Sequence, residues 1–308
     1  MRKVLVAGGS SFTGSNIIKY FNRVQPGFNM INLDRYDGTS LRDLPPALTD
    51  SSYDYVKVDL RYREGVWHHS IGTELIINCV WSDAGAVPMQ SNDYVDITLM
   101  GLNNLLQSAR ARNTSRFVQV STADVYGPRS SGNSVEGDVL HPLDLRSGIR
   151  AAADTLVWAF AQQWDLGAMI VRPTNLYGPN MSQHELLPQT LTAIVEGRPV
   201  PKELSEYTVR DWLSVDDFCS GIDVVTRGGT VKQIYNIASE SPVSDYDLVD
   251  KLSEIVGRPA AASWKKRKGL SGTRASAGKL RKLGWEPKDV LFDKLPEMLE
   301  LYTEWRRA

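Results

Sequence analysis

A glycine-rich turn near the start of the chain has the residue types of a phosphate-binding site. The segment 6–16 reads VAGGSSFTGSN, with glycines at positions 8, 9 and 14 between an apolar run and a helical pattern. Backbone N–H groups and the helix dipole at such a turn point toward an anion, and small residues let a phosphate come close. Ser15 and Asn16 stand where an ATP-binding P-loop needs Lys and Ser or Thr, which argues against that motif.

An acidic residue lies at the distance that dinucleotide binding requires. Asp34 ends the apolar run 28–34 and follows Gly14 by 20 residues. A carboxylate at that place binds the ribose hydroxyls of adenosine and repels a 2′-phosphate, so NAD is favoured over NADP. Arg35 beside it weakens that preference. The glycines alone would indicate only a tight turn, but strand, turn, helix and acid together predict nucleotide binding.

Two arginines form a second group that could do chemistry. Arg146 and Arg150 stand four residues apart in HPLDLRSGIRAAADTLVWAF, where a helical pattern begins. Side chains at that spacing lie on one face of a helix. Such a pair is usually solvated surface charge, so spacing by itself leaves open whether the arginines belong to a site.

The elements that must position these residues alternate between strands and helices. Helical spacing follows the glycine-rich turn, and it recurs across 93–112 and in the arginine segment. Apolar runs predict strands at 3–7, 28–34, 53–60, 74–80, 115–127 and 168–179. This alternation indicates right-handed βαβ units, and therefore an α/β fold with a Rossmann-type, doubly wound parallel sheet.

The composition changes after residue 179, where turns and amphipathic helices become more frequent. We expect residues 1–179, with a returning strand near 233–239, to form the nucleotide-binding domain. Residues 180–308 are expected to form a smaller substrate-binding lobe over the carboxyl edge of the sheet.

The overall composition is that of an ordinary globular protein. The balance of 35 Lys and Arg against 36 Asp and Glu gives no support to a nucleic-acid or membrane-surface partner. No stretch approaches the roughly 20 apolar residues of a membrane helix, and the first apolar run is too short for a signal peptide. The two cysteines and four histidines have neither disulfide-framework nor zinc-ligand spacing. We therefore expect a cytoplasmic protein that holds no metal.

Several motifs, in order along the chain, resemble those of the extended short-chain dehydrogenase/reductases, the nucleotide-sugar epimerase and dehydratase group. They are VLVAGGSSFTGSN, VKVDL, STADVYG, RPTNLYGP, VRDWLSVDD and KLRKLGWEP. STADVYG and VRDWLSVDD resemble most the nucleotide-hexose 4,6-dehydratases. The resemblance runs nearly from end to end. It implies NAD as cofactor, a nucleotide sugar or related small molecule as ligand, and a homodimer formed through the helices at 98–112 and 146–164.

The resemblance also implies which residues form the site. Asp59 would contact the adenine, and Asn175 and Arg210 would bind the diphosphate of the nucleotide sugar. Two alternatives stay open, since Asn175 can instead make an Asx-turn and Arg210 can pair with an Asp of the chain. The implied cofactor-binding residues are Gly8, Ser10, Ser11, Phe12, Thr13, Gly14, Asp34, Arg35, Asp59, Leu60, Val80, Trp81, Thr98 and Arg150. The implied substrate-binding residues are Asn175, Leu187 and Arg210.

The YxxxK pair of the family falls on Arg146 and Arg150. In the family, the tyrosine exchanges a proton with the sugar hydroxyl while hydride moves to or from nicotinamide, and the lysine binds the nicotinamide ribose and lowers the tyrosine pKa. Arg150 can keep the ribose contact and the fixed charge. An arginine side chain has a pKa of roughly 12.5–13.8, so Arg146 cannot serve as the proton shuttle.

Other departures from the family point to an altered active site. Ala123 stands where dehydratases have their acid, and Asp124 stands at the position of their base. Three hypotheses follow. The first is an enzyme in which Thr122 or Asp124 moves the proton and Arg146 stabilises an oxyanion or grips a carboxylate. The second is a relative that binds nucleotides without turnover. The third is an enzyme of non-redox chemistry, such as elimination or cyclisation.

Overall fold

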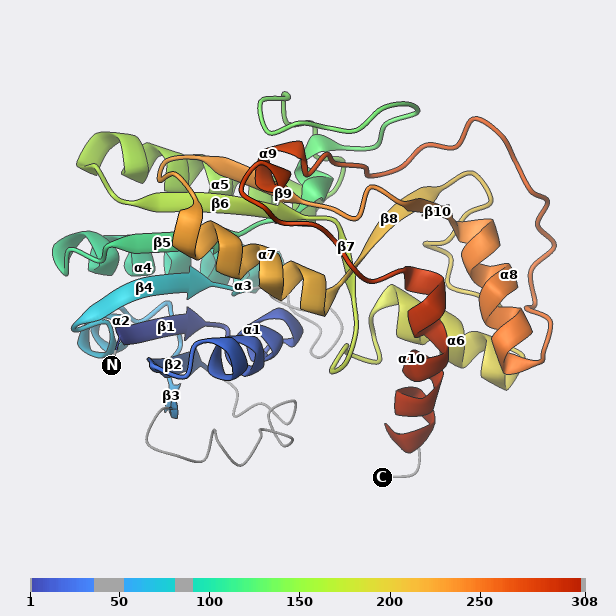
Figure 1. Cartoon of the computed structure of the whole chain (residues 1–308), viewed down its shortest axis with the longest axis horizontal. Coiled ribbons are helices and arrows are strands. Elements are labelled where there is room, and N and C mark those ends of the chain that lie inside the picture. Colours follow the sequence, from blue (N-terminus) through green and yellow to red (C-terminus); the bar gives the residue numbers. More distant parts are fainter. Residues whose placement is uncertain (1, 36–52, 81–90, 306–308) are drawn as a thin grey trace.

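A seven-stranded parallel sheet runs through the larger part of the molecule (Figure 1). The computed structural model describes residues 2–35, 53–80 and 91–305. Within them the strand order is β3-β2-β1-β4-β5-β6-β9, and every neighbouring pair is parallel. The strands are β1 (Arg2–Ala7), β2 (Phe28–Asp34), β3 (Tyr53–Lys57), β4 (Thr73–Asn78), β5 (Arg116–Val120), β6 (Ala168–Pro173) and β9 (Ile234–Ile237). The predicted Rossmann-type α/β fold is confirmed.

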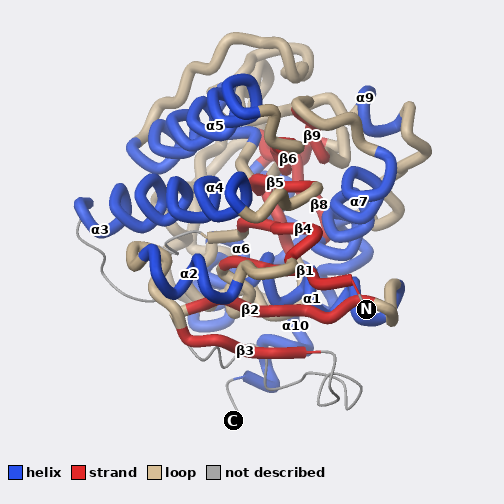
Figure 2. The backbone as a smooth tube through the Cα atoms, turned by 90° about the vertical axis from the view of Figure 1, so that its left-hand side faces the viewer, coloured by secondary structure: helices blue, strands red, loops and turns tan. Residues whose placement is uncertain are grey.

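Helices cover both faces of this sheet, as the view along the strands shows (Figure 2). One face is covered by α2 (Arg63–His69), α4 (Gly101–Ala111) and α5 (Leu145–Trp164). The other is covered by α1 (Phe12–Val24), α7 (Val215–Gly228) and the short α9 (Gly278–Arg281). The helix α3 (Ser91–Val95) continues through a π-helical segment (Asp96–Met100) into α4. The sheet is therefore buried on both sides, which is why its strands read as continuous apolar runs.

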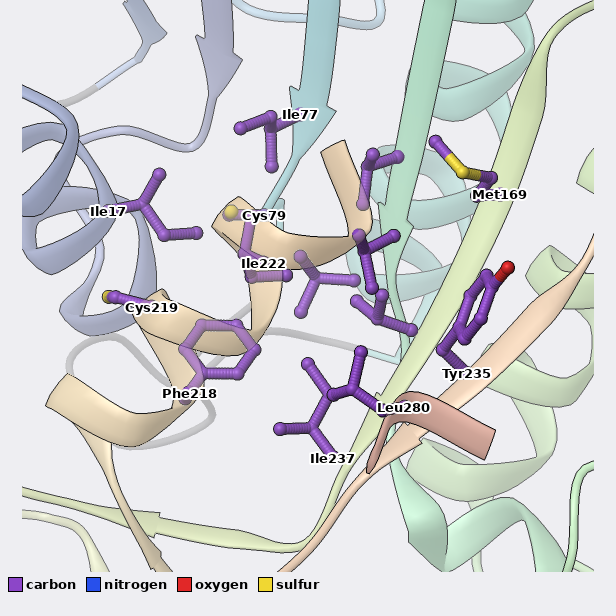
Figure 3. Packing of buried hydrophobic residues seen from close by; sticks show 14 of the residues in the cluster. Ile17, Ile77, Cys79, Met169, Phe218, Cys219, Ile222, Tyr235, Ile237 and Leu280 are labelled. Atoms are coloured by element: carbon purple, nitrogen blue, oxygen red, sulfur yellow. The ribbon is translucent and has the colours of Figure 1, made fainter. Parts of the chain in front are cut away.

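The apolar residues of these runs meet in two core clusters, one on each face of the sheet. Figure 3 shows the cluster under α7, where Phe218 and Ile222 pack toward Ile77 of β4 and Ile237 of β9. Two cysteines, one after β4 and one in α7, belong to this cluster, and burial raises the pKa of both thiols. They are buried packing residues with free thiols.

A smaller group of elements lies beyond the carboxyl ends of the sheet strands (Figure 1). Its sheet contains β7 (Asn175–Tyr177), β8 (Val209–Ser214) and β10 (Pro242–Ser244), with β8 parallel to β7 and antiparallel to β10. The helices α6 (Leu186–Glu196), α8 (Asp245–Val256) and α10 (Leu291–Trp305) pack together around a third core cluster. The division at residue 179 stays a prediction. The packing places α7 and α9 with the large sheet.

Two strands of the structure are shorter than the apolar runs that predicted them. The run 115–127 forms a strand only to Val120, because Thr122 then caps a 3₁₀ turn over Ala123–Tyr126. The run 168–179 divides at Thr174 into β6 and β7, which belong to different sheets. Both changes of direction occur at the carboxyl edge of the large sheet. The segments after these two strands therefore carry polar side chains, such as Thr122 and Asn175, at that edge.

No helix among the described residues is long and apolar enough to span a membrane. In the same part of the chain, no group of three or more His, Cys, Asp or Glu side chains is arranged to hold a metal ion.

Candidate active site

A cleft of about 680 Å³ opens where the large sheet meets the smaller group of elements. Its walls come from the segments that follow β1, β5 and β6, from the start of α5, and from β8. Ligands of doubly wound sheets bind at this place, outside the carboxyl ends of the strands. The cleft brings together these predicted site residues: Ser11, Phe12, Thr13, Thr122, Asp124, Arg146, Arg150, Asn175 and Arg210.

The glycine-rich turn delivers the N-terminus of α1 to the cleft. Ser11 caps the helix, since its Oγ accepts a hydrogen bond from the Gly14 N–H at 3.1 Å and donates one to the Gly8 carbonyl at 2.6 Å. Gly8 has φ +74°, and a Cβ on Gly14 would lie 2.2 Å from the Gly8 carbonyl oxygen. Glycine at these two positions therefore makes the turn tight. Free N–H groups at the start of α1 then face the cleft, where they can meet a phosphate.

The acid at the end of β2 is tied to the same turn. The Asp34 carboxylate accepts a hydrogen bond from the Ser10 N–H at 3.0 Å. Gly8 also donates its N–H to the Leu33 carbonyl at 2.8 Å, so the strand end and the turn are joined on both sides. This arrangement fixes a carboxylate beside the glycine-rich turn, which is the arrangement that adenosine ribose recognition requires. Arg35 follows directly on the chain.

The two arginines are held on a well-capped helix. Asp144 is the N-cap of α5, accepting the Ser147 N–H at 2.7 Å, while the Ser147 hydroxyl accepts the Asp144 N–H at 3.2 Å. This capping box lies in the cleft wall itself, and it sets Arg146 and Arg150 on the helix face that lines the cleft. The predicted helix and the shared face are both present.

The two guanidinium groups have different surroundings. Arg146 is exposed to the cleft and makes no hydrogen bond or ion pair with the described residues. Arg150 is half-buried. Burial lowers the pKa of Arg150, a hydrogen bond to the phenol of Tyr94 opposes that shift, and the charge of Arg146 adds to it. The wall therefore carries two like charges one helical turn apart.

A carboxylate and a hydroxyl face the arginines from the end of β5. Thr122 donates its hydroxyl to Asp124 Oδ2 at 3.2 Å and accepts the Asp124 N–H at 3.2 Å. The other carboxylate oxygen, Oδ1, accepts a hydrogen bond from the Thr273 hydroxyl at 2.8 Å. The Asp124 side chain is exposed and lines the cleft. It can therefore exchange a proton with a bound ligand.

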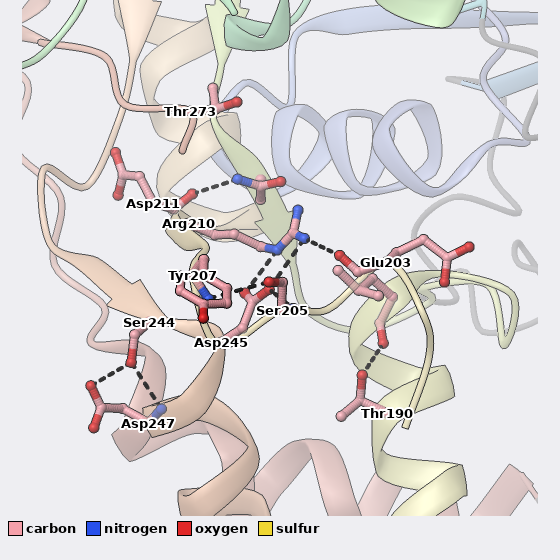
Figure 4. A network of polar contacts seen from close by, with 12 residues as sticks. Thr190, Glu203, Ser205, Tyr207, Arg210, Asp211, Ser244, Asp245, Asp247 and Thr273 are labelled. Carbon is pink, nitrogen blue, oxygen red and sulfur yellow. Dashed lines mark hydrogen bonds and ion pairs between the residues drawn. The ribbon is translucent and has the colours of Figure 1, made fainter. Parts of the chain in front are cut away.

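The far wall carries Arg210, whose guanidinium is oriented by the chain itself (Figure 4). Its Nε lies 2.9 Å from Oδ1 of the buried Asp245, and Nη2 donates to Asp245 Oδ2 at 3.3 Å and to the Glu203 carbonyl at 2.7 Å. The Arg210 side chain is 20 % exposed, and it lines the cleft. Asn175 donates its Nδ2 to the Asp211 carbonyl at 3.1 Å across the β7–β8 pair. Arg210 therefore pairs with an Asp of the chain, which was the alternative to a ligand role, and it also lines the cleft.

Comparison with known proteins decides the family. A model described as the NAD dependent epimerase/dehydratase family matches residues 4–238. The chain belongs to this family.

Three relatives of this epimerase/dehydratase chain cover nearly all of it. Low-salt glycan biosynthesis protein Agl12 of Haloferax volcanii is 31% identical over 97% of this chain and 98% of its own length. The dTDP-glucose 4,6-dehydratase of Bacillus anthracis, solved in complex with NAD, is 28% identical with a TM-score of 0.84, covering 99% of this chain and 97% of that chain. DesIV, the dTDP-glucose 4,6-dehydratase of Streptomyces venezuelae, was solved with NAD and TYD bound. It is 26% identical with a TM-score of 0.87, covering 99% of this chain and 98% of that chain.

Several residues that the resemblance to the epimerase/dehydratase family implied do not line the cleft. Asp59 pairs with Arg61, with Oδ2 and Nη2 2.7 Å apart. Burial raises the pKa of Asp59, but the hydrogen bonds from Arg61 outweigh it and hold that pKa below its usual range. The others in this group are Gly8, Ser10, Gly14, Asp34, Arg35, Leu60, Val80 and Thr98. Trp81 lies outside the described residues.

Leu187 is not a cleft residue in this family member. Its side chain is 2 % exposed and belongs to the third core cluster. Leu186, at the first position of α6, lines the cleft instead. Consecutive side chains on a helix point about 100° apart, so only one of the two leucines can face the cleft.

The cleft of this epimerase/dehydratase chain also contains residues with buried polar groups that no motif in the sequence indicated. Two of the cleft residues, Thr174 and Trp212, carry a hydroxyl and an indole N–H that are buried and have no hydrogen-bond partner among the described residues. One signal was available, because Trp212 lies two residues after Arg210 on a strand and therefore on the same face.

Proposed function

We propose that this chain binds NAD along the glycine-rich turn, with one end of NAD in the cleft, and binds a nucleotide sugar in the cleft. It would act on the sugar as an enzyme without the tyrosine–lysine pair. One observation carries the proposal. The same cleft is lined by the start of α1, by the arginine pair with Asp124, and by Arg210 on the opposite wall.

The residues present fit NAD. The N-terminus of α1 provides phosphate-binding N–H groups, and Asp34 is fixed beside the turn by the Ser10 N–H. Two relatives of similar fold were solved with NAD. NAD supplies hydride transfer when bound. Arg150 in this chain provides a fixed positive charge and N–H donors at the place where the family has its lysine.

Proton exchange with the sugar is assigned to Asp124. The guanidinium of Arg146 stays charged at every working pH, so it cannot accept a proton. Asp124 is an exposed carboxylate in the cleft that Arg146 and Arg150 also line, and among the described residues its oxygens accept hydrogen bonds from the hydroxyls of Thr122 and Thr273. Arg146 makes no hydrogen bond or ion pair among the described residues, so its charge is available to an oxyanion or carboxylate of the ligand.

The nucleotide diphosphate is assigned to Arg210 and Asn175. Asp245 and the Glu203 carbonyl hold the Arg210 guanidinium by Nε and Nη2. A fixed guanidinium loses little entropy when it binds a phosphate, and charge-assisted bonds of this kind are strong. DesIV, 26% identical, was solved with TYD bound.

A second candidate is a relative that binds these ligands without turnover. The observation that favours it is the loss of both the tyrosine and the lysine, since the family's proton shuttle is then missing. Binding and turnover must therefore be measured separately.

The binding test is a thermal-shift panel of UDP-, dTDP-, GDP- and CDP-sugars with NADH present. At least one nucleotide sugar should raise the Tm. Arg210→Ala should weaken its binding by roughly 10- to 100-fold, as loss of a charge-assisted contact predicts. Arg227→Ala is the matched control, because Arg227 is also paired with an Asp of the chain, Asp223, but lies outside the cleft. No stabilisation of a well-folded protein by any sugar would contradict the proposal.

The turnover test follows the nucleotide sugar found by the panel. Its conversion is measured by mass spectrometry in the wild type and in Asp124→Asn. If the wild type converts the sugar and Asp124→Asn does not, the result supports the proposed enzymatic function. Tight binding without any conversion identifies the non-catalytic relative instead.

A further inference from the structure

We infer that Thr273 is a positioning residue, which holds the Asp124 carboxylate in the cleft and prevents it from pairing with Arg150. The inference rests on the proposed function, in which Asp124 exchanges the proton. Thr273 is 149 residues away from Asp124 along the chain, in the segment between α8 and α9.

Asp124 lines the same cleft as Arg150 but does not pair with it. The negative charge of Asp124 acts on the guanidinium of Arg150. Nevertheless, within the part of the chain that the structure describes, Asp124 forms no ion pair with Arg150 or Arg146. Its two oxygens are taken instead by the hydroxyls of Thr122, at 3.2 Å, and Thr273, at 2.8 Å. The shorter hydrogen bond comes from Thr273.

The backbone that carries Thr273 is fixed on its N-terminal side. We call residues 271–276 the strap. Ser271 donates its N–H to the Tyr207 carbonyl at 3.2 Å and accepts the Val209 N–H at 3.1 Å, so the strap is joined to the strand that bears Arg210. Gly272 and Arg129 exchange two backbone hydrogen bonds, at 2.9 and 3.1 Å.

The strap is fixed equally on its C-terminal side. The Arg274 carbonyl accepts the Ser134 N–H at 3.0 Å, and Ser276 donates its N–H to the Ser134 carbonyl at 2.8 Å. Thr273 therefore stands between two anchored neighbours. Its β-branched side chain has few χ1 rotamers, so the direction of its hydroxyl is set by the fold.

Gly272 shows how closely the strap approaches the cleft wall. A Cβ at this position would lie 1.7 Å from the Val209 carbonyl oxygen, so only glycine allows the contact. The strap connects the loop after β5, through Arg129 and Thr273, with β8 on the opposite wall. The strap thereby sets the distance between Asp124, to which proton exchange is assigned, and Arg210, to which the diphosphate is assigned.

The chemical consequence concerns the charge of the reacting group. A carboxylate that accepts hydrogen bonds from neutral hydroxyls keeps its charge and one face for the ligand. If the Thr273 hydroxyl were absent, the carboxylate could rotate toward Arg150. An ion pair there would occupy the base and also cancel the positive charge that Arg150 presents to the cofactor.

The test compares Thr273→Val, which removes the hydroxyl at nearly constant shape, with Thr273→Ser, which keeps it. Thr155→Val is the control, because the Thr155 hydroxyl bonds to the Ala151 carbonyl on the exposed side of α5. Thr273→Val should lower kcat on the identified nucleotide sugar about tenfold or more, with KM changed less than about twofold. Calorimetry should also show that the preference for NADH over NAD⁺ narrows several-fold. Thr273→Ser and Thr155→Val should match the wild type in both measurements.

A double-mutant cycle separates positioning from general stability. In an Asp124→Asn background, Thr273→Val should have little further effect on the NADH to NAD⁺ affinity ratio, because its action passes through the carboxylate. Thr273→Ala replaces Thr273→Val if the latter fails to fold.

Two outcomes overturn the inference alone. In the first, Thr273→Val has the kcat and the NADH to NAD⁺ affinity ratio of the wild type. In the second, Thr273→Val changes that affinity ratio as much in the Asp124→Asn background as in the wild type. Absence of binding of both NAD⁺ and NADH to the wild type overturns the proposed function, and the inference with it.

Discussion

The guanidinium of Arg172 and the carboxylate of Asp154 form an ion pair behind the cleft, with Nε and Oδ2 2.9 Å apart and each side chain 3 % exposed. Arg172 also donates to the Tyr126 hydroxyl at 2.8 Å, and that hydroxyl donates to the Asn236 side chain at 2.8 Å. Burial raises the pKa of Asp154, and the charge of Arg172 opposes the shift. The network links β6, α5, the turn after β5 and β9, and it therefore supports the elements that carry Asp124 and Arg150.

Breaking this pair should destabilise the fold. Arg172→Met leaves the Asp154 charge buried and unpaired, so the free energy of unfolding should fall by about 3–5 kcal/mol in urea titrations. The double variant Arg172→Met with Asp154→Leu removes both charges and should recover most of that loss. An average substitution lowers the free energy of unfolding by about 1 kcal/mol. If Arg172→Met lowers it by no more than this, the ion pair is dispensable for stability.

The cofactor should be NAD rather than NADP. The Asp34 carboxylate is held beside the glycine-rich turn by the Ser10 N–H. A carboxylate at that place repels a 2′-phosphate and can accept hydrogen bonds from ribose hydroxyls. Calorimetry with both cofactors should show tighter binding of NAD, and Asp34→Ala should narrow the difference. Arg35→Ala should widen it, since it removes a cation next to that site. Equal or tighter NADP binding by the wild type would contradict the role of Asp34.

The arginine pair should favour the reduced cofactor. Two fixed positive charges line the cleft one turn apart, and they repel the cationic nicotinamide ring of NAD⁺ more than the neutral ring of NADH. Without substrate, NADH should therefore bind more tightly than NAD⁺. Changing Arg146→Tyr together with Arg150→Lys should narrow the ratio of the two dissociation constants. A ratio that the double change leaves unaltered would place the nicotinamide away from these side chains.

A buried acid next to the cleft should make stability depend on pH. Burial raises the pKa of Asp211 to about 6, and hydrogen bonds from Ser239 and the Glu240 N–H only partly oppose it. The ordinary value of an aspartate, about 3.9, applies to the unfolded chain. The folded state thus holds the proton more tightly. Its contribution to stability is complete below about pH 4 and is lost as the pH rises through about 6.

The size of this effect follows from the difference between the folded and unfolded pKa of Asp211, and it is roughly 2 kcal/mol between pH 4 and pH 7. Asp211→Asn cannot titrate. The free energy of unfolding of the wild type minus that of Asp211→Asn should therefore fall by about this amount over the same range, in urea titrations at several pH values. A difference that stays constant with pH would assign the titration to another group.

The sequence was sufficient to predict the elements of this protein and part of its site. The strands, the glycine-rich turn and the helix with Arg146 and Arg150 depend on residues close together in the chain. Apolar runs, tight-turn glycines and side chains four apart on a helix each have a local physical cause. The order of strands and helices then brought the start of α1, Asp124 and the arginines to one edge of the sheet, because all parallel strands end on the same side.

Only the tertiary structure decided which side chains hold the site residues in place. Thr273 and Asp124 are 149 residues apart, and Arg210 and Asp245 are 35 apart, so no local pattern couples them. Leu187 shows the same limit, because a rotation of about 100° along α6 sends it into the core while Leu186 lines the cleft. Backbone preference is set by near neighbours, whereas the contacts of a loop or a helix face depend on how distant segments pack. For that reason the chemistry of the cleft could be predicted from residue types, but the network that orients it could not.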